Sequence, residues 1–192
     1  MNERVGDVLL DHLDEHLTAV AAVRDLVPEV VSLGEEICRR LERGGTVYTF
    51  GNGGSAADAQ HFAAELVGRY LRDRRPLPAV ALSTDPSVTT CIGNDYAYDS
   101  VFSRQVTALV RPADVVIGFS TSGTSPSVVE GLGAARRNGA LTVLLTGEKA
   151  AGSPAADRVL PVASRATARI QEGHVLLLHM LSELIDRWAV DA

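Results

Sequence analysis

The chain has 192 residues, of which 46% are hydrophobic and 22% are charged, and its formal net charge is −6. A chain of this length and composition is expected to fold around one core and is far from the disordered class. The acidic balance argues against nucleic acid as a partner, because nucleic-acid binding requires a basic surface.

Targeting and redox signals are weak. The first residues, MNERVGDVLLDHLDEHL, are acidic and unlike a secretory signal, and no segment approaches the ~20 apolar residues of a membrane helix. Cys38 and Cys91 are too few for a disulfide framework. By elimination we expect a cytoplasmic protein with reduced cysteines and no membrane partner.

Residues 1–43 predict a pair of helices. Apolar residues recur at helical spacing through residues 5–27, and Pro28 precedes a second helical stretch over 29–43. A helical pair outside the α/β core carries an apolar face that either the core or another subunit must cover. We favour contact with another subunit.

Residues 44–192 predict an α/β core. Short apolar runs at 46–50, 79–83, 114–120, 141–146 and 158–163 predict five strands, each followed by a helix, the last helix over 167–189. Runs without clean alternation indicate strands buried on both faces. The predicted fold class is α/β, one doubly wound domain with a five-stranded parallel sheet flanked by helices. The run RYLRDRRPLP at 69–78 predicts a surface loop.

Two strand ends carry unusual loops. Gly51-Asn52-Gly53-Gly54-Ser55 follows the first strand, and STSGTSPS at 120–127 follows the third. Ligands of open parallel sheets bind at the carboxyl ends of strands. Glycines let a ligand approach the backbone, helix N-termini favour anions, and five hydroxyls exceed what an N-cap needs. The two loops therefore predict a site for a phosphorylated ligand.

A dinucleotide site is the alternative for the first loop. Gly51, Gly53 and Ala56 fit a G-x-G-x-x-A pattern, and Asp85 could bind a ribose. The hydroxyl-rich second loop, which a dinucleotide does not require, favours a site without a nucleotide cofactor.

Four side chains suit a metal ion. His61 and Glu65 lie one turn apart on one helix, and the last predicted helix carries Gln171 and His179. Together they have the ligand types for zinc. Because eight residues span about 12 Å of helix axis, Gln171 and His179 of one helix cannot both reach one ion without strain. We therefore predict that one site uses helices of two subunits.

Four ordered motifs extend this interpretation. They are GNGGSAADAQHFAAEL at 51–66, GNDYAYDSVFSRQ at 93–105, STSGTS at 120–125 and ARIQEGHVLLLH at 168–179. With them the chain resembles the phosphoheptose isomerases of the sugar-isomerase (SIS) domain superfamily over nearly its whole length. The resemblance implies one SIS domain over 1–192, working as a homotetramer with sites at subunit interfaces. It also implies interconversion of sedoheptulose 7-phosphate and an aldoheptose 7-phosphate.

The resemblance also implies residue roles. The phosphate would be held by Ser120, Thr121, Ser122 and Ser125, with Arg69 near the anion. The sugar would be bound by Asn52, Gly53, Ser55, Asp95 and Gln171. The acid/base pair would be Glu65 and His179, and the zinc ligands would be His61, Glu65, Gln171 and His179. Thr124 and Ala168 depart from the residues Asn and Asp that relatives carry, which affects substrate specificity more than reaction type.

Two other functions stay open. SIS-domain adaptors bind partner proteins without catalysis, but adaptors similar to this chain replace the second histidine of the RIQE-x-H-x4-H motif, which is present here as His179. An isomerase of a related heptulose or octulose phosphate is the second alternative.

Overall fold

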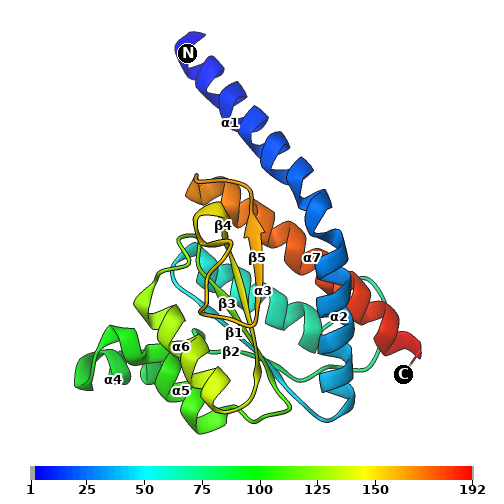
Figure 1. Cartoon of the computed structure of the whole chain (residues 1–192), viewed down its shortest axis with the longest axis vertical. Coiled ribbons are helices and arrows are strands. Elements are labelled where there is room, and N and C mark those ends of the chain that lie inside the picture. The colour runs from blue at the N-terminus through cyan, green and yellow to red at the C-terminus, as the bar shows by residue number, and fades with distance from the viewer. Residues whose placement is uncertain (1–2, 192) are drawn as a thin grey trace.

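The computed structural model describes residues 3–191, so the outermost positions of the predicted segments lie outside it. The chain begins with α1 (Glu3–Ala22), a 3-10 turn (Val23–Leu26) and α2 (Val27–Glu42). The predicted helical pair is confirmed, with Pro28 in the first turn of α2, where its missing N–H costs nothing. Helix α1 projects away from the rest of the molecule (Figure 1).

The sheet has five parallel strands in the order β2-β1-β3-β4-β5. They are β1 (Val47–Gly51), β2 (Ala79–Ala81), β3 (Val115–Phe119), β4 (Leu141–Gly147) and β5 (Arg158–Val162). Every residue of β3 and β4 is buried. The predicted α/β class is thus confirmed, and the continuous apolar runs reflect helices on both faces.

Alternate strand residues point into two cores. On one face α2, α3 (Gly54–Val67) and α7 (Thr167–Asp191) pack over Ile117 and Val143. On the other, α5 (Val101–Leu109) and α6 (Pro126–Arg137) pack over Val116 and Leu144, with α4 (Pro86–Asp95) and a 3-10 turn (Tyr98–Ser100) completing this layer. The layers are visible in Figure 1.

The expectation of a helix after every strand is wrong for β4. Only a 3-10 turn (Glu148–Ala150) and an irregular segment link β4 to β5. Gly152 and Pro154 interrupt this short connection, and both residues disfavour a helix. No helix within residues 3–191 is long and apolar enough to cross a membrane.

The strand order places the two predicted loops side by side. The chain leaves β1 for the edge strand β2 and then returns to pair β3 with the other side of β1. Connections from β1 and β3 therefore diverge, which opens a crevice at their carboxyl ends where doubly wound proteins bind ligands. The order matches the flavodoxin-like type and not the 3-2-1-4-5-6 order of dinucleotide-binding domains.

Candidate active site

Asn52 joins the two strand-end loops. Its Nδ2 donates to Ser125 Oγ at 3.0 Å and to Ser127 Oγ at 2.9 Å. Its Oδ1 accepts a hydrogen bond from the Tyr98 hydroxyl at 2.9 Å, which adds the motif at 93–105 to the same place. The loops after β1 and β3 thus form one continuous polar surface.

The glycine loop needs glycine at two positions. Gly53 has φ +58°, which favours glycine. A Cβ on Gly51 would lie 2.6 Å from the Ser55 carbonyl oxygen, too close for any side chain. The tight turn places the N-terminus of α3 at the crevice, and the positive end of a helix dipole favours an anion.

The hydroxyl-rich loop is closed by its own hydrogen bonds. Ser120 Oγ accepts from the Gly123 amide, and Ser122 Oγ accepts from the Thr124 amide, both at 3.2 Å. Gly123 has φ +68°. Hydroxyls and amides therefore converge on a short turn at the start of α6, an arrangement suited to an anion.

Two cations beside this loop escaped the sequence analysis. Lys149 and Arg165 line a small cavity of about 170 Å³ together with Thr121 and Ser122. They follow β4 and β5, at the same edge of the sheet as the hydroxyl loop. In the sequence, the signal for these two residues is their position after predicted strands. This signal is weak, because only the strand order shows that those strand ends lie near the hydroxyl-rich loop.

A second cluster forms further along α3. One ligand atom each of His61, Glu65 and His179 lies within 4.8 Å of the others. His61 Nε2 is 2.9 Å from Glu65 Oε1 and 3.4 Å from His179 Nε2. Bonds of about 2.1 Å in tetrahedral geometry separate zinc ligands by about 3.4 Å. Two imidazoles and one carboxylate with an open fourth position fit a catalytic zinc ion.

The cluster is only partly accessible to solvent. The side chains of Glu65 and His61 are 18% and 39% exposed. Burial lowers the pKa of His179, neighbouring His61 lowers it further, and Glu65 opposes the shift. A neutral imidazole is the form that binds a metal ion or accepts a proton.

Gln171 lies apart from this cluster. Its side-chain amide contacts Gly54 at the start of α3: Nε2 is 2.6 Å from where a Cβ on Gly54 would stand. Because α3 and α7 run in the same direction, Gln171 faces the glycine loop and His179 faces His61, about two turns further on. Within one chain, three of the four predicted metal ligands come together and the fourth lies beside the glycine loop.

Other predicted site residues differ in their surroundings. Ser55 and Ser120 are buried at the loops, whereas Arg69 is exposed and donates to the Leu71 carbonyl. Asp95 accepts hydrogen bonds from Asn94 and Cys91 within its own helix, so among residues 3–191 its side-chain hydrogen bonds stay within α4 and do not reach the crevice.

Asp85, the residue considered for a ribose, has another role. Its Oδ1 accepts from the amides of Ser87 and Val88 and caps α4. An N-cap with two such bonds explains the aspartate without a nucleotide. Together with the strand order, this weakens the dinucleotide alternative.

Asp58 is a further buried acid that the sequence analysis left unassigned. It lies on α3 three residues before His61, and its Oδ2 is buried without a hydrogen-bond partner. Burial raises the pKa of Asp58 to about 6, and His61 partly offsets this. The folded protein therefore carries a carboxyl group that changes charge near neutral pH beside the His61 cluster. An Asp on the inward face of a ligand-loop helix was the available signal.

Asp58→Asn is expected to stabilise the protein at pH 8. A folded-state pKa raised from 3.8 to about 6 means that the free energy contributed by Asp58 is lost as pH rises through 6. Removing the buried charge should raise the unfolding free energy by about 2–3 kcal/mol at pH 8. Thermal melts at pH 8 and pH 4 check this. An equal shift at both pH values would contradict a charge effect.

The fold and these loops define an α/β domain of the sugar-phosphate-binding type. In agreement, the sequence profile described as "SIS domain" matches residues 14–147. A phosphoheptose isomerase of Solidesulfovibrio magneticus is 53% identical over 100% of this chain and 95% of its own length. Phosphoheptose isomerase GmhA of Neisseria gonorrhoeae superposes with a TM-score of 0.87 at 42% identity, covering 95% of this chain and 99% of that one. The chain belongs to the SIS-domain family and, within it, to the phosphoheptose isomerases.

Proposed function

We propose that the protein interconverts sedoheptulose 7-phosphate and an aldoheptose 7-phosphate, with Glu65 and His179 transferring protons. The observation that carries this proposal is the joining of two anion-binding loops by Asn52, in a chain that also brings Glu65 and His179 together. A protein-binding adaptor would require neither feature, which makes that alternative less favoured.

The chemistry matches these residue types. Isomerisation removes a proton from C1 of the ketose, forms an enediol, and returns a proton to C2 while a proton moves between the two oxygens. Glu65 is the base that handles the carbon-bound proton, and the neutral imidazole of His179 moves the proton between O1 and O2. The loops at 51–55 and 120–125 hold the sugar and its phosphate, so that the first two carbons are oriented.

A zinc ion would be held by His61, Glu65 and His179. When bound, it would polarise the substrate carbonyl and stabilise the enediolate. A carboxylate that binds metal is a weaker base, so Glu65 serves as ligand and as base in turn. We place Gln171 with the substrate, or with the metal of a neighbouring copy.

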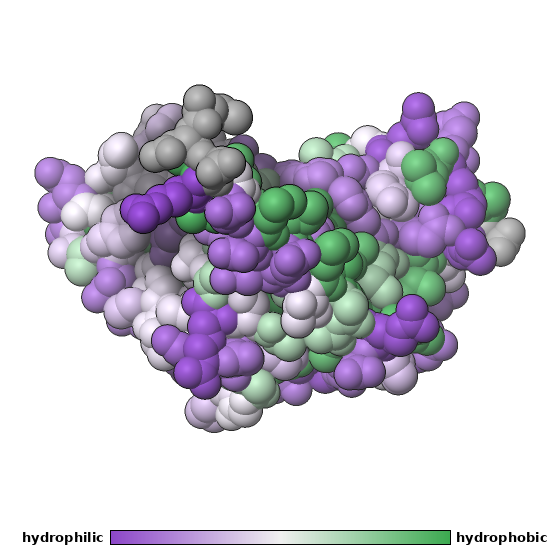
Figure 2. Space-filling model, turned by 90° about the horizontal axis from the view of Figure 1, so that it is seen from above, coloured by the Kyte–Doolittle hydropathy of each residue, from purple (hydrophilic) through white to green (hydrophobic). Residues whose placement is uncertain are grey.

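We further propose a homotetramer whose sites lie between subunits. Within one chain, Gly54 of the glycine loop and His61 of the cluster are separated by about 10 Å along α3. The cluster opens onto an uncovered apolar groove of about 660 Å³. This groove is lined by His179 and Tyr70 together with Val31, Leu176, Met180 and Leu184. Apolar residues on α1 are also uncovered: Val5, Val8, Leu9, Leu13 and Leu17 are each about half exposed. Figure 2, viewed from the end where α1 projects, shows hydrophobic side chains at the surface among hydrophilic ones.

A second copy of the chain would cover these surfaces and bring a cluster to a neighbouring crevice. Sedimentation of the protein tests this, since a monomer would contradict it.

We also propose a cytoplasmic location, which suits the exposed free thiol of Cys91.

Turnover and its zinc dependence test the function. We expect the purified protein to convert sedoheptulose 7-phosphate to aldoheptose phosphate, and expect His179→Asn to weaken zinc binding by about 10–100-fold or more. Product formation is followed with and without added zinc, and zinc affinity by calorimetry. Absence of turnover under both conditions would favour the adaptor, and preference for another ketose phosphate would favour the related isomerase.

A further inference from the structure

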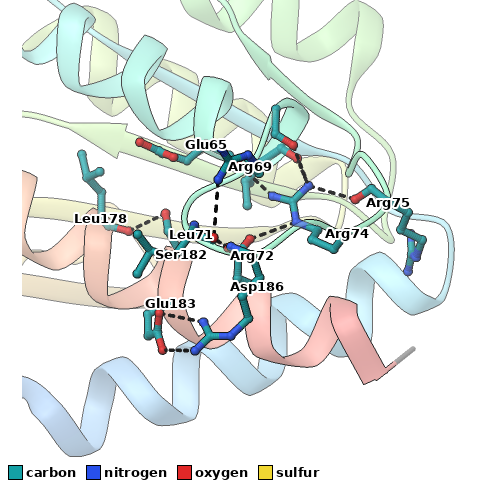
Figure 3. A network of polar contacts seen from close by, with 12 residues as sticks. Glu65, Arg69, Leu71, Arg72, Arg74, Arg75, Leu178, Ser182, Glu183 and Asp186 are labelled. Atoms are coloured by element: carbon teal, nitrogen blue, oxygen red, sulfur yellow. Dashed lines mark hydrogen bonds and ion pairs between the residues drawn. The ribbon is translucent and has the colours of Figure 1, made fainter.

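The segment between α3 and β2, residues 68–78, is irregular but held by a buried ion pair. Arg74 Nε lies 2.9 Å from Asp186 Oδ1, and the two side chains are 0% and 1% exposed. Asp186 Oδ2 accepts hydrogen bonds from the amides of Leu71 and Arg72 at 2.8 Å and 2.9 Å. One carboxylate of α7 therefore holds three residues of this segment, as Figure 3 shows. The predicted surface loop is confirmed as a loop, but the side chain of its Arg74 is buried.

The guanidinium of Arg74 also reaches the end of α3. Its Nη2 donates to the Glu65 carbonyl at 2.7 Å, and its Nη1 donates to the Leu66 carbonyl at 2.8 Å and the Gly68 carbonyl at 3.2 Å. Carbonyls of the last helical turn lack partners within the helix. Arg74 satisfies them and so fixes the backbone that carries the Glu65 side chain.

The same segment supports His179 from the other side. The ring of Tyr70 stacks on the His179 imidazole, with centroids 5.3 Å apart and an interplanar angle of 24°. Tyr70 directly precedes Leu71, whose amide is bound by Asp186. The pair thus holds both the backbone of Glu65 and the aromatic ring that faces His179.

The charge state of Asp186 agrees with this arrangement. Burial by itself would raise the pKa of Asp186, but the amides of Arg72 and Leu71 and the ion pair with Arg74 outweigh it and lower the pKa. The pair is therefore ionised at neutral pH. Its attraction is largely offset by the desolvation of two charges, so buried ion pairs contribute little net stability. Its contribution here is to hold the 68–78 segment and the end of α3 in one arrangement.

We propose that Arg74 and Asp186 are positioning residues for the isomerase site, setting the placement of Glu65 and the orientation of His179 through the 68–78 segment. This inference rests on the proposed function for its kinetic consequence. Neither residue touches the substrate; both act through the groups that do.

Arg74→Lys and Asp186→Asn test the proposal, with Arg75→Gln as the matched control. Arg75 is the next residue, is exposed, and its guanidinium lies over the face of Trp188 on α7, 5.2 Å from the ring centre. We expect kcat for sedoheptulose 7-phosphate to fall about 10–100-fold in the first two variants with KM within about threefold, since small displacements of catalytic groups have effects of this size. The control should retain wild-type kcat.

A spectroscopic measurement separates positioning from stability. Stacking on Tyr70 shifts the ring-proton NMR signals of His179 upfield, and Tyr70→Leu supplies the unstacked reference. We expect Arg74→Lys and Asp186→Asn to move these signals toward the reference, and Arg75→Gln to leave them unchanged. If Asp186→Asn does not fold, the test rests on the His179 signals of Arg74→Lys, compared with those of the Tyr70→Leu reference. Both of these variants preserve the charges at the buried site.

Unmoved His179 signals, or a wild-type kcat in folded Arg74→Lys, would overturn the proposal and leave the pair a purely structural element. The NMR measurement does not require turnover. An inactive wild-type protein would therefore refute the proposed function, while the positioning of His179 is still decided by its signals.

Discussion

Glu65→Gln is expected to reduce turnover by about 10²–10⁴-fold while the protein stays folded. A general base contributes acceleration of this order, and an amide cannot accept the carbon-bound proton. Glutamine retains the size of glutamate, and its side-chain amide can form a hydrogen bond with His61 Nε2, which is 2.9 Å from Glu65 Oε1 in the wild-type protein. The melting temperature should therefore change little. Steady-state kinetics on sedoheptulose 7-phosphate and a thermal melt are the measurements.

The matched control is Glu36→Gln. Glu36 is also a helical glutamate with hydrogen-bonded partners, Arg39 and Arg40, but it lies on α2. Its replacement removes the same charge and should leave kcat unchanged, because partly exposed ion pairs contribute little. Zinc affinity of Glu65→Gln, measured in parallel, reports the loss of a ligand. A variant that binds zinc normally and still turns over at more than a tenth of the wild-type rate would remove Glu65 from proton transfer.

Gly123→Ala is expected to raise KM for the sugar phosphate by about 10–100-fold. A Cβ at this position would lie 2.2 Å from Ala150 Cβ and 2.8 Å from Thr146 Oγ1, and φ is +68°. The hydroxyl-rich turn must therefore move, and the amide and Ser120 hydroxyl that meet at Gly123 would lose their alignment. One charge-assisted hydrogen bond to a phosphate contributes about 1.5–3 kcal/mol, which corresponds to this change in KM.

Gly133→Ala on the following helix, α6, is the control. An added Cβ there would make only an ordinary contact, 3.5 Å from Arg137 Nη1. In a helix this substitution stabilises by about 0.5–1 kcal/mol, and KM should not change. If Gly123→Ala lowers the melting temperature but leaves KM at the wild-type value, the turn does not hold the phosphate.

Much of the fold could be predicted from local patterns. The apolar runs identify β3 and β4 because strands covered on both faces need no polar residues. The glycines at 51–54 and the hydroxyls at 120–127 identify two ligand loops because few structural roles require such residues together. The sequence analysis predicted a helix after β4 that the structure does not contain. The expected alternation of strands and helices was extended over a segment that contains Gly152 and Pro154.

The site was less completely predictable, because its groups come from separate parts of the chain. Motif matching names His61, Glu65 and His179, but only packing of α3 against α7 brings them together and sends Gln171 to the glycine loop. Asp58, Lys149 and Arg165 carry only weak local signals, a place on the helix of a ligand loop or after a strand end, which many ordinary residues share.

The sequence by itself determined the α/β class and the membership of the phosphoheptose isomerases, and it predicted two phosphate-type loops, since these depend on periodicity and on motifs within short segments. The tertiary structure alone decided that the arginine of an apparent surface loop is buried against an aspartate 112 positions away. Burial of a charge depends on which distant groups surround it, and the balance between desolvation and pairing exists only once the chain has folded.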